Sequence, residues 1–118
     1  MYSYHFYVDA KIILQISEGA GLLYGYLQQA IRDKADSFDM HKEERLRQGD
    51  DYLDEEEIYL NEQARERWFP FTATEIQKAI GMSKKRQAES IRRLVKANKI
   101  EVKKGLGLGN TRLFGIVR

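Results

Sequence analysis

The sequence predicts one α+β domain that is mainly helical and ends in a small β-hairpin. Three observations lead to this prediction. Apolar residues recur at helical spacing over 18–34 and again over 84–98, and residues 100–117 alternate between polar and apolar side chains around a glycine-rich turn. With 118 residues, of which 42% are apolar, the chain is long enough for one hydrophobic core and too short for two. We therefore expect residues 1–118 to fold as a single domain.

Composition excludes several classes of protein. The chain has no cysteine, so it forms neither disulfides nor thiolate sites, as is common in a reducing cytoplasm. Its N-terminus lacks the basic start and the small-residue cleavage site of a secretory signal. No uncharged apolar run is long enough to span a membrane. We expect a cytoplasmic protein that makes no contact with membranes.

No catalytic or metal site is predicted. The only histidines, His5 and His41, have no cluster of partner groups nearby in the sequence that would make either one a general base. The acidic run GDDYLDEEE lacks the alternating oxygen ligands and the glycine of a calcium loop. The glycines of GLGLGN do not have the spacing of a dinucleotide-binding turn. We expect no enzyme activity and no cofactor.

The formal net charge of +2 hides a strong asymmetry along the chain. Residues 36–67 hold twelve acidic and five basic side chains, a net charge of −7, whereas residues 83–118 hold eleven basic and two acidic ones, a net charge of +9. A basic surface of this density attracts polyanions. The acidic segment is too long for an ordinary connection, so we expect an acidic insertion over 36–67 that is partly helical or mobile.

The N-terminal half contains one well-defined helix. The segment YHFYVDAKIILQI fits a short strand and the first turn of a helix equally well. From Glu18 to Lys34 the pattern is clearly helical. Its apolar stripe consists of Leu23, Tyr26, Leu27, Ala30 and Ile31. We expect this stripe to pack against the rest of the domain.

Local start and stop signals follow the acidic segment. Pro70 excludes a helix in WFPFT, which we expect to be extended. Thr72 and Glu75 fit a capping box that begins a short helix. Gly81 is placed to end that helix in a left-handed conformation, and Ser83 is a suitable N-cap for the next one. Two helices joined by a tight turn are therefore predicted.

The last elements complete a recognisable order. After the basic helix over 84–98, the segments IEVKK and TRLFGIV alternate like strands around GLGLGN and predict a β-hairpin. The predicted elements follow the order of a winged helix-turn-helix with an acidic insertion before the helix-turn-helix: helix, short strand, helix, tight turn, basic helix and hairpin. In that fold the second helix enters the major groove of DNA and the hairpin forms the wing.

The basic helix is expected to present one face to DNA and another to the core. On a helical wheel, Ala88, Ile91, Leu94 and Val95 form the expected core face. Arginine, lysine and serine on the other side can bind base edges or phosphates. The predicted DNA-binding residues are, for the bases, Lys85, Arg86 and Ser90, with Ser83 and Lys84 at the helix start; for the phosphates, Arg93 and Lys96; and from the hairpin, Lys103, Lys104, Asn110 and Arg112.

Parts of the sequence resemble a known family. The resemblance lies in FYVDAKIILQISEGAGLLYGYL, TATEIQKAIGMSKKRQAESIRRLVKANKIEV and GNTRLFGI, and it is to the N-terminal winged-helix domain of phage and plasmid replication initiation proteins, the replisome-organiser and DnaD-like group. It covers both ends of the chain but not residues 36–67. The resemblance implies a domain that binds double-stranded origin DNA or forms homo-oligomers, with a partner in the replication machinery.

Other interpretations stay open at this stage. Winged-helix transcriptional regulators share the glycine turn, the basic helix and the hairpin. Winged helices also serve as docking modules, and the tyrosine-rich segments YSYHFYV and LLYGYL are candidates for a self-association surface. Residues 36–67 are either a solvated acidic segment or an intramolecular competitor that covers the basic face in place of DNA.

Overall fold

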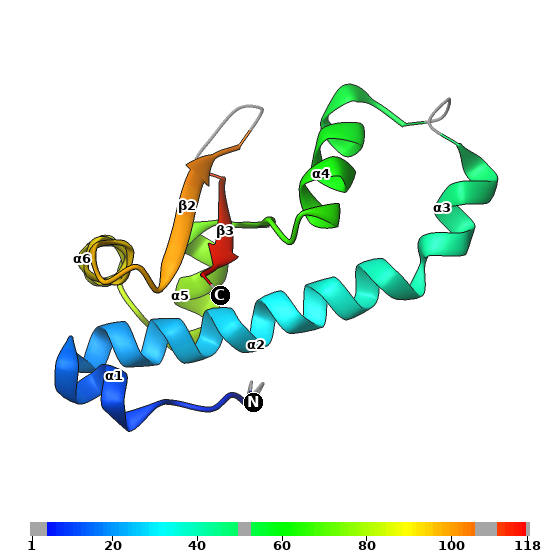
Figure 1. Ribbon diagram of the computed structural model, residues 1–118. Coiled ribbons are helices and arrows are strands. Elements are labelled where there is room, and N and C mark those ends of the chain that lie inside the picture. The colour runs from blue at the N-terminus through cyan, green and yellow to red at the C-terminus, as the bar shows by residue number, and fades with distance from the viewer. Residues whose placement is uncertain (1–4, 50–52, 106–110, 118) are drawn as a thin grey trace.

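The computed structural model describes residues 5–49, 53–105 and 111–117 (Figure 1). The helices and strands in these ranges are, in chain order, α1 (Ala10–Gln15), α2 (Glu18–Met40), α3 (Lys42–Gln48), α4 (Glu55–Arg65), β1 (Phe69–Phe71), α5 (Ala73–Ile80), α6 (Lys84–Lys96), β2 (Ile100–Lys104) and β3 (Arg112–Ile116). The protein is mainly helical with a small antiparallel sheet, which confirms the predicted α+β class. The N-terminal segment, for which the sequence allowed a strand or a helix, contains the helix α1, and the side chain of Asp9 caps its start.

α2 is the longest helix, and the other elements pack around it (Figure 1). Its predicted apolar stripe is buried in the hydrophobic core. The predicted end at Lys34 is wrong, since the helix continues to Met40. No glycine or proline interrupts the chain between these two residues, and Ala35 and Phe38 extend the apolar side against the core.

The sheet has three antiparallel strands in the order β1-β3-β2. β2 and β3 form the predicted hairpin, and its glycine-rich tip at 106–110 lies outside the described residues. β1 pairs with β3 and places Phe71 in the core, where its ring centroid lies 5.5 Å from that of Phe114 and 6.1 Å from that of Tyr26. These edge-to-face ring contacts join the sheet to α2.

The predicted helix start at Thr72, helix end at Gly81 and N-cap at Ser83 are confirmed, but the capping box is only half formed, because the carboxylate of Glu75 binds Lys34. The hydroxyl of Thr72 accepts the backbone N–H of Glu75 at 3.0 Å and caps α5. Gly81 ends α5 with φ 69° and ψ 14°, the left-handed conformation that glycine adopts without steric cost. The hydroxyl of Ser83 then accepts a backbone N–H in the first turn of α6. The two helices are thus joined by a tight turn that the sequence dictates locally.

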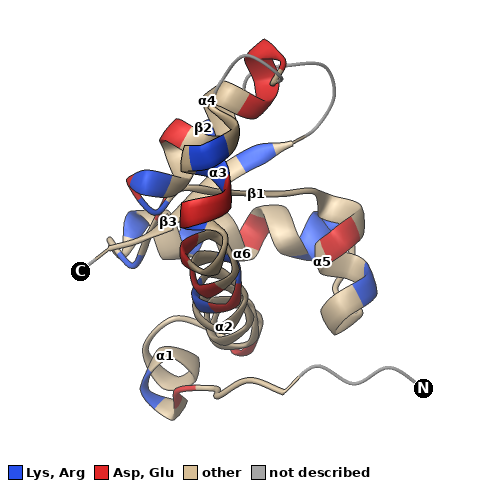
Figure 2. Cartoon of the chain, turned by 90° about the vertical axis from the view of Figure 1, so that its right-hand side faces the viewer, with Lys and Arg blue, Asp and Glu red and all other residues tan. Residues whose placement is uncertain are grey.

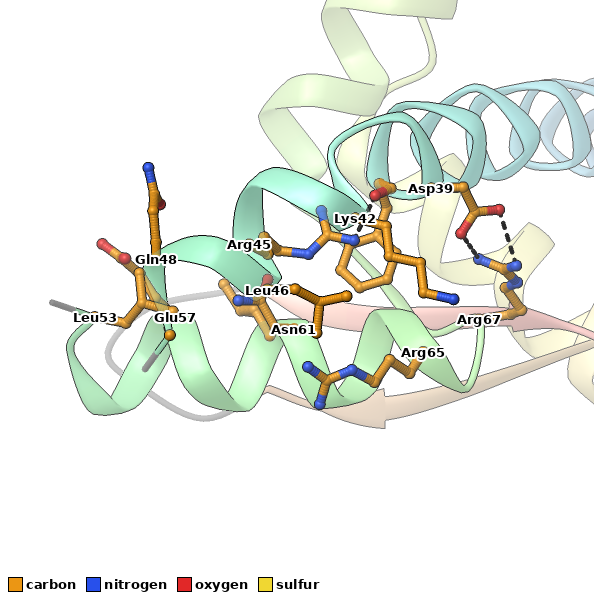
Figure 3. Close-up of a pocket in the computed structure, with 13 residues that line it drawn as sticks. Asp39, Lys42, Arg45, Leu46, Gln48, Leu53, Glu57, Asn61, Arg65 and Arg67 are labelled. Atoms are coloured by element: carbon orange, nitrogen blue, oxygen red, sulfur yellow. Dashed lines mark hydrogen bonds and ion pairs between the residues drawn. The ribbon is translucent and has the colours of Figure 1, made fainter. Parts of the chain in front are cut away.

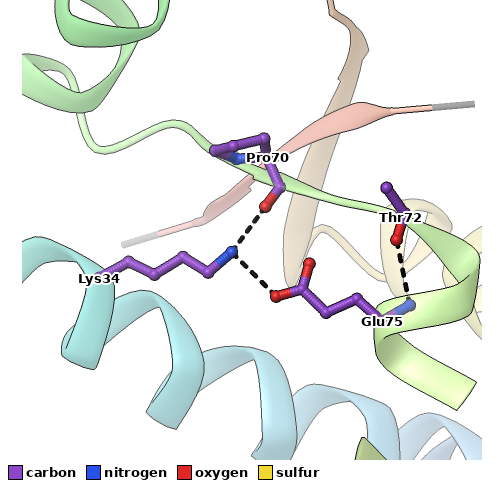
Figure 4. A network of polar contacts seen from close by, with 4 residues as sticks. All are labelled: Lys34, Pro70, Thr72 and Glu75. Carbon is purple, nitrogen blue, oxygen red and sulfur yellow. Dashed lines mark hydrogen bonds and ion pairs between the residues drawn. The ribbon is translucent and has the colours of Figure 1, made fainter. Parts of the chain in front are cut away.

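Hydrogen bonds from the side chain of Lys34 connect α2, β1 and α5 (Figure 4). The ammonium group of Lys34 donates to the carbonyl oxygen of Pro70 at 2.8 Å and to the carboxylate of Glu75 at 3.2 Å. It also lies 4.0 Å from the ring centroid of Phe71. The carboxylate of Glu75 therefore makes a tertiary contact between α2 and α5, whereas only the backbone N–H of Glu75 takes part in the cap at Thr72.

The acidic segment, expected to be partly helical or mobile, begins within α2. α3 and α4 follow, and the guanidinium of Arg67 closes the segment by pairing with the carboxylate of Asp39 at 3.2 and 3.1 Å. In Figure 1, α4 and α6 lie on opposite sides of the hairpin. The described part of the acidic segment therefore does not cover the basic helix, and this arrangement gives no support to the competitor hypothesis.

Candidate nucleic-acid interface

α6 turns a different face to the core from the one predicted. Its buried residues are Gln87, Ser90, Ile91 and Leu94, which are spaced i, i+3, i+4 and i+7. Ala88 and Val95 are exposed, Val95 by 44%, so their assignment to the core is wrong. The helix also ends at Lys96 and not at 98, since Asn98 has a left-handed φ of 58°. The prediction misplaces the face because two polar residues occupy core positions.

Gln87 is fully buried because its amide joins three segments of the chain. Its Nε2 atom donates to the carbonyl oxygen of Ala73 at the start of α5, at 3.0 Å, and to that of Met82 in the turn before α6, at 2.8 Å. Buried carbonyl groups need such donors, since an unpaired one is costly. The amide fixes α6 against α5 and the turn, and so sets which residues of α6 face outward.

Ser90 and Arg86 lie on the side of α6 that faces α2. A Cβ atom on Gly19 would lie 2.9 Å from the Ser90 hydroxyl and 3.6 Å from Nη2 of Arg86, so glycine at this position lets the helices approach closely. Ser90 is only 4% exposed, and the prediction that it contacts bases is wrong because its hydroxyl points into this helix–helix contact. Arg86 is exposed but leans over the first turn of α2.

The face of α6 opposite the buried residues is exposed and mostly basic. It consists of Lys85, Glu89, Arg92 and Lys96. Arg92 is missing from the predicted site, because the predicted wheel is centred on Ala88 and Val95. The i, i+3, i+4, i+7 spacing that begins at Gln87 is the signal that would have placed Arg92 outward.

The remaining predicted residues of α6 are exposed at its edges. Ser83 and Lys84 lie at the helix start, and Arg93 lies on the flank next to the outward face. Each of these three side chains is therefore accessible to a ligand.

The start of α6 and the hairpin border a common groove of about 480 Å³. Lys84 enters it from α6, and Lys103, Lys104 and Arg112 enter it from the two strands of the hairpin. Among the described residues that line the groove there is no carboxylate. The fold thus brings together four of the predicted residues from two elements that are separate in the sequence.

Two of the hairpin cations rest on aromatic rings. The ammonium group of Lys103 lies 4.3 Å from the ring centroid of Trp68, and the guanidinium of Arg112 lies 5.5 Å from that of Phe114. Such cation–π contacts hold a charged side chain in place without neutralising its charge. Lys104 is exposed, and the predicted contact residue Asn110 lies outside the described residues.

The basic side chains of α6 and the hairpin form no ion pair within the described part of the chain. The ion pairs found there are Lys34–Glu75, Arg47–Glu43 and Arg67–Asp39. In Figure 2, basic residues lie at the distal end of β2 and acidic residues lie at the start of α4. The positive charge of α6 and the hairpin therefore remains available to an external anion.

Two other kinds of site are not found in residues 5–49, 53–105 and 111–117. No three His, Asp or Glu side chains stand together in a way that would hold a metal ion. No helix there combines the length and the apolar character that crossing a bilayer requires.

Comparison with protein-family models, with curated proteins and with solved structures finds no match to this chain. The function is therefore inferred from the sequence and from the geometry of the site.

Proposed function

We propose that this protein binds double-stranded DNA as a winged helix-turn-helix domain, with α6 in the major groove and the β2–β3 hairpin along the sugar–phosphate backbone. One observation carries the proposal. Four cations and, among the described residues, no carboxylate line the groove between α6 and the hairpin, and the outward face of α6 carries Lys85, Arg92 and Lys96. The proposal implies a cytoplasmic protein that acts by binding and not by catalysis.

The two surfaces are assigned different roles in this complex. An arginine side chain can bind O6 and N7 of guanine with two hydrogen bonds, so Arg92 is assigned to a base edge. Glu89 lies on the same face and can accept a hydrogen bond from the amino group of cytosine. Lys84, Lys104 and Arg112 are assigned to phosphates, which fix the register of the protein on the duplex.

The first test is the dependence of duplex affinity on salt concentration. If five to seven phosphates are neutralised, the logarithm of the affinity falls with the logarithm of the salt concentration with a slope of roughly −4.5 to −6. Fluorescence anisotropy with a labelled random duplex measures this slope. A flat salt response would contradict the proposal.

Charge reversal tests the location of the interface. Arg92→Glu combined with Lys96→Glu is expected to weaken duplex binding by about a hundredfold or more, because two attractive contacts become repulsive. The matched control, Lys11→Glu with Arg32→Glu, changes the net charge equally at exposed positions of α1 and α2. We expect it to weaken binding by less than about threefold. Equal losses in the two double variants would show that α6 is not the contact surface.

Within this proposal, the resemblance described above favours replication initiation, with a partner in the replication machinery, and transcriptional regulation is the alternative. The two roles require different DNA sites. Selection of bound fragments from random DNA and from phage DNA distinguishes them, since enrichment of iterated repeats supports initiation and enrichment of a promoter palindrome supports regulation.

A second candidate function is a protein-interaction module, and the N-terminal region favours it. Tyr7 is 90% exposed and Leu14 is 85% exposed, and large apolar side chains left in solvent are common at interfaces. Charge reversal of Arg86 and Arg93 separates the two functions. Loss of DNA binding with unchanged oligomer size supports DNA binding, whereas loss of assembly supports interaction as the main function.

A further inference from the structure

We propose that the groove between α3 and α4 binds a short peptide segment of another protein, one that carries apolar side chains together with carboxylates. The groove has a volume of about 730 Å³ and lies at the end of α2 that is away from α6 (Figures 1 and 3). All of its lining residues belong to the segment 36–67, which the resemblance described above does not cover. The site is separate from the proposed DNA interface, and the inference does not rest on DNA binding.

The groove contains most of the positive charge of an otherwise acidic segment. Four of the five basic side chains of residues 36–67 line it, whereas only two of the ten acidic side chains that the structure describes in this segment do so. The lining cations are Lys42, Arg45, Arg65 and Arg67, and the lining carboxylates are Asp39 and Glu57. Arg67 and Asp39 pair with each other at 3.1 Å. The remaining wall has three cations and one carboxylate, so it favours an anionic ligand.

These three cations stay charged and unpaired within the described part of the chain. Lys42 and Arg65 are exposed and form no ion pair there. The guanidinium of Arg45 lies 3.5 Å from the ring centroid of Phe38 and donates to the Phe38 carbonyl oxygen. These contacts orient Arg45 without neutralising its charge. A carboxylate of the ligand can therefore bind at this wall.

Apolar surface lies between the charged groups. In Figure 3, Leu46 lies between Arg45 and Arg65, and Glu57 lies at the end of the groove away from Lys42. The other apolar lining residues are Phe38, Leu53 and Leu60. Glu57 and Arg65 are eight positions apart on α4, which corresponds to about 12 Å along the helix axis. The ligand must therefore present apolar and acidic groups within a short distance.

α3 lacks the packing that normally stabilises a short helix. It has seven residues, none of them buried, and isolated helices shorter than about 12 residues are marginal in water. Leu46 on this helix is 72% exposed and borders the groove. An apolar side chain of the ligand would bury Leu46 and stabilise α3.

A peptide fits these features better than DNA does. Protein–DNA interfaces are strongly polar, so a duplex would leave the apolar part of the groove without a partner. Five further carboxylates of α3 and α4 are exposed and do not line the groove, namely Glu43, Glu44, Glu55, Glu56 and Glu62. They would repel a polyanion that extends past the groove. A short amphipathic peptide meets only the groove and supplies both kinds of group.

Selection from a random dodecapeptide library displayed on phage tests the chemistry of the ligand. The bait is the full chain with Arg92→Glu and Lys96→Glu, which reduces the attraction of acidic peptides to α6. We expect the enriched peptides to combine leucine, isoleucine or phenylalanine with aspartate or glutamate. Absence of enrichment, or enrichment of peptides without acidic residues, would overturn the proposal.

Charge reversal locates the binding site of an enriched peptide. Fluorescence anisotropy of the labelled synthetic peptide measures its affinity for the full chain. Lys42→Glu combined with Arg65→Glu is expected to weaken binding by at least about tenfold, because two attractive contacts become repulsive. The matched control, Arg92→Glu with Lys96→Glu, changes the net charge equally on α6, and we expect it to weaken binding by less than about threefold. Equal losses in the two double variants would contradict the assignment to the groove.

A polar substitution tests the apolar part of the groove. Leu46→Ser is expected to weaken binding of the same peptide by at least about fivefold, because the buried apolar contact is lost. Leu14→Ser, at a leucine of similar exposure on α1, is the control and is expected to have no effect. Both side chains are exposed, and circular dichroism checks that each variant keeps its helices. An unchanged affinity of Leu46→Ser would exclude the groove as the peptide site.

Other occupants of the groove give different results in the same assays. Displacement of the peptide from the wild-type chain by a short unlabelled duplex would assign the groove to DNA. A dimer in sedimentation velocity that the peptide dissociates would assign it to a second copy of the chain, and either result overturns the proposal. The two interfaces fail separately, since Lys42→Glu with Arg65→Glu is expected to leave duplex affinity unchanged, and the peptide results stand even if the chain binds no DNA.

Discussion

Gln87 shows how one polar side chain determines which residues face outward. A glutamine in a basic, amphipathic helix is expected at the surface, because burying an amide without partners is costly. Here the carbonyl oxygens of Ala73 and Met82 supply the partners, and both belong to segments that reach Gln87 only in the folded chain. The side-chain oxygen Oε1 of Gln87 is buried without a partner among the described residues. Burial of this amide is therefore compensated only by the two hydrogen bonds that Nε2 donates.

Replacement of Gln87 by methionine is the test of this role. Gln87→Met keeps the length and approximate volume of the side chain but removes both donors. The buried Met82 carbonyl then has no partner, and the Ala73 carbonyl keeps only its helical bond within α5. We expect the free energy of unfolding to fall by about 1–3 kcal/mol, measured by urea denaturation. The control is Gln77→Met on α5, where the side chain is exposed and the expected change is below about 0.5 kcal/mol. Similar losses in the two variants would contradict the role of the buried amide.

Residue-scale predictions succeed where the cause is local. Thr72, Gly81 and Ser83 act on backbone groups within a few positions, so their types and spacing are sufficient to place both helix starts and the turn. The orientation of α6 is different, because it depends on contacts with α2 and α5 that no local pattern contains. For that reason the predicted site includes the buried Ser90 and omits the exposed Arg92.

At the scale of elements, two glycines let the N-terminal region lie flat on α2. A Cβ atom on Gly25 would overlap the carbonyl oxygen of Tyr7, and one on Gly21 would overlap the side chain of Ile13. The close approach brings the ring of Phe6 into edge contact with Tyr26, at 6.0 Å between centroids. Glycine inside a helix normally destabilises it. At Gly21 and Gly25 the lower stability of α2 is accompanied by a close contact with the N-terminal region that a larger residue would prevent.

The variant Gly25→Ala tests this arrangement. The added methyl group is expected to displace residues 5–9, because it would overlap backbone and not the end of a flexible side chain. α2 itself gains up to about 1 kcal/mol from the higher helix propensity of alanine, so global stability is expected to change little.

Hydrogen exchange measures the effect of Gly25→Ala directly. We expect faster exchange in α1 and the residues before it, and unchanged exchange in α6. Arg32→Ala, at an exposed position further along α2, is the control and is expected to alter neither region. Unchanged protection of α1 in Gly25→Ala would show that the close approach is not required.

Element boundaries and pairings differ in how far the sequence determines them. The extended segment at 69–71 is predictable because Pro70 excludes a helix. Its pairing with β3 is not, since that contact joins residues more than forty positions apart, such as Phe69 and Phe114. The extension of α2 to Met40 is missed for a related reason, because the acidic composition of the following segment masks the apolar positions Ala35 and Phe38.

At the scale of the whole molecule, charge is separated along an elongated shape of 48 × 33 × 27 Å. α6 and the hairpin strands carry nine Lys and Arg side chains against two Glu, and α4, on the other side of the hairpin, carries four Glu against one Arg (Figures 1 and 2). Exposed charges interact weakly beyond the Debye length, which is about 8 Å at physiological ionic strength. The basic surface should therefore attract DNA as if the acidic end were absent, and the net charge of +2 should be a poor guide to affinity.

Two substitutions with the same effect on net charge test this directly. Glu89→Gln removes a carboxylate from the outward face of α6, and Glu56→Gln removes one from the exposed first turn of α4. At physiological salt we expect Glu89→Gln to tighten binding to random duplex DNA by about two- to fivefold, because a negative charge close to the polyanion is lost and few random sites offer the cytosine contact. Glu56→Gln is expected to leave the affinity unchanged under the same conditions and to tighten it only at low salt, where screening is weak. Equal effects of the two variants in anisotropy titrations at physiological salt would mean that total charge, and not its placement by the fold, governs the attraction to DNA.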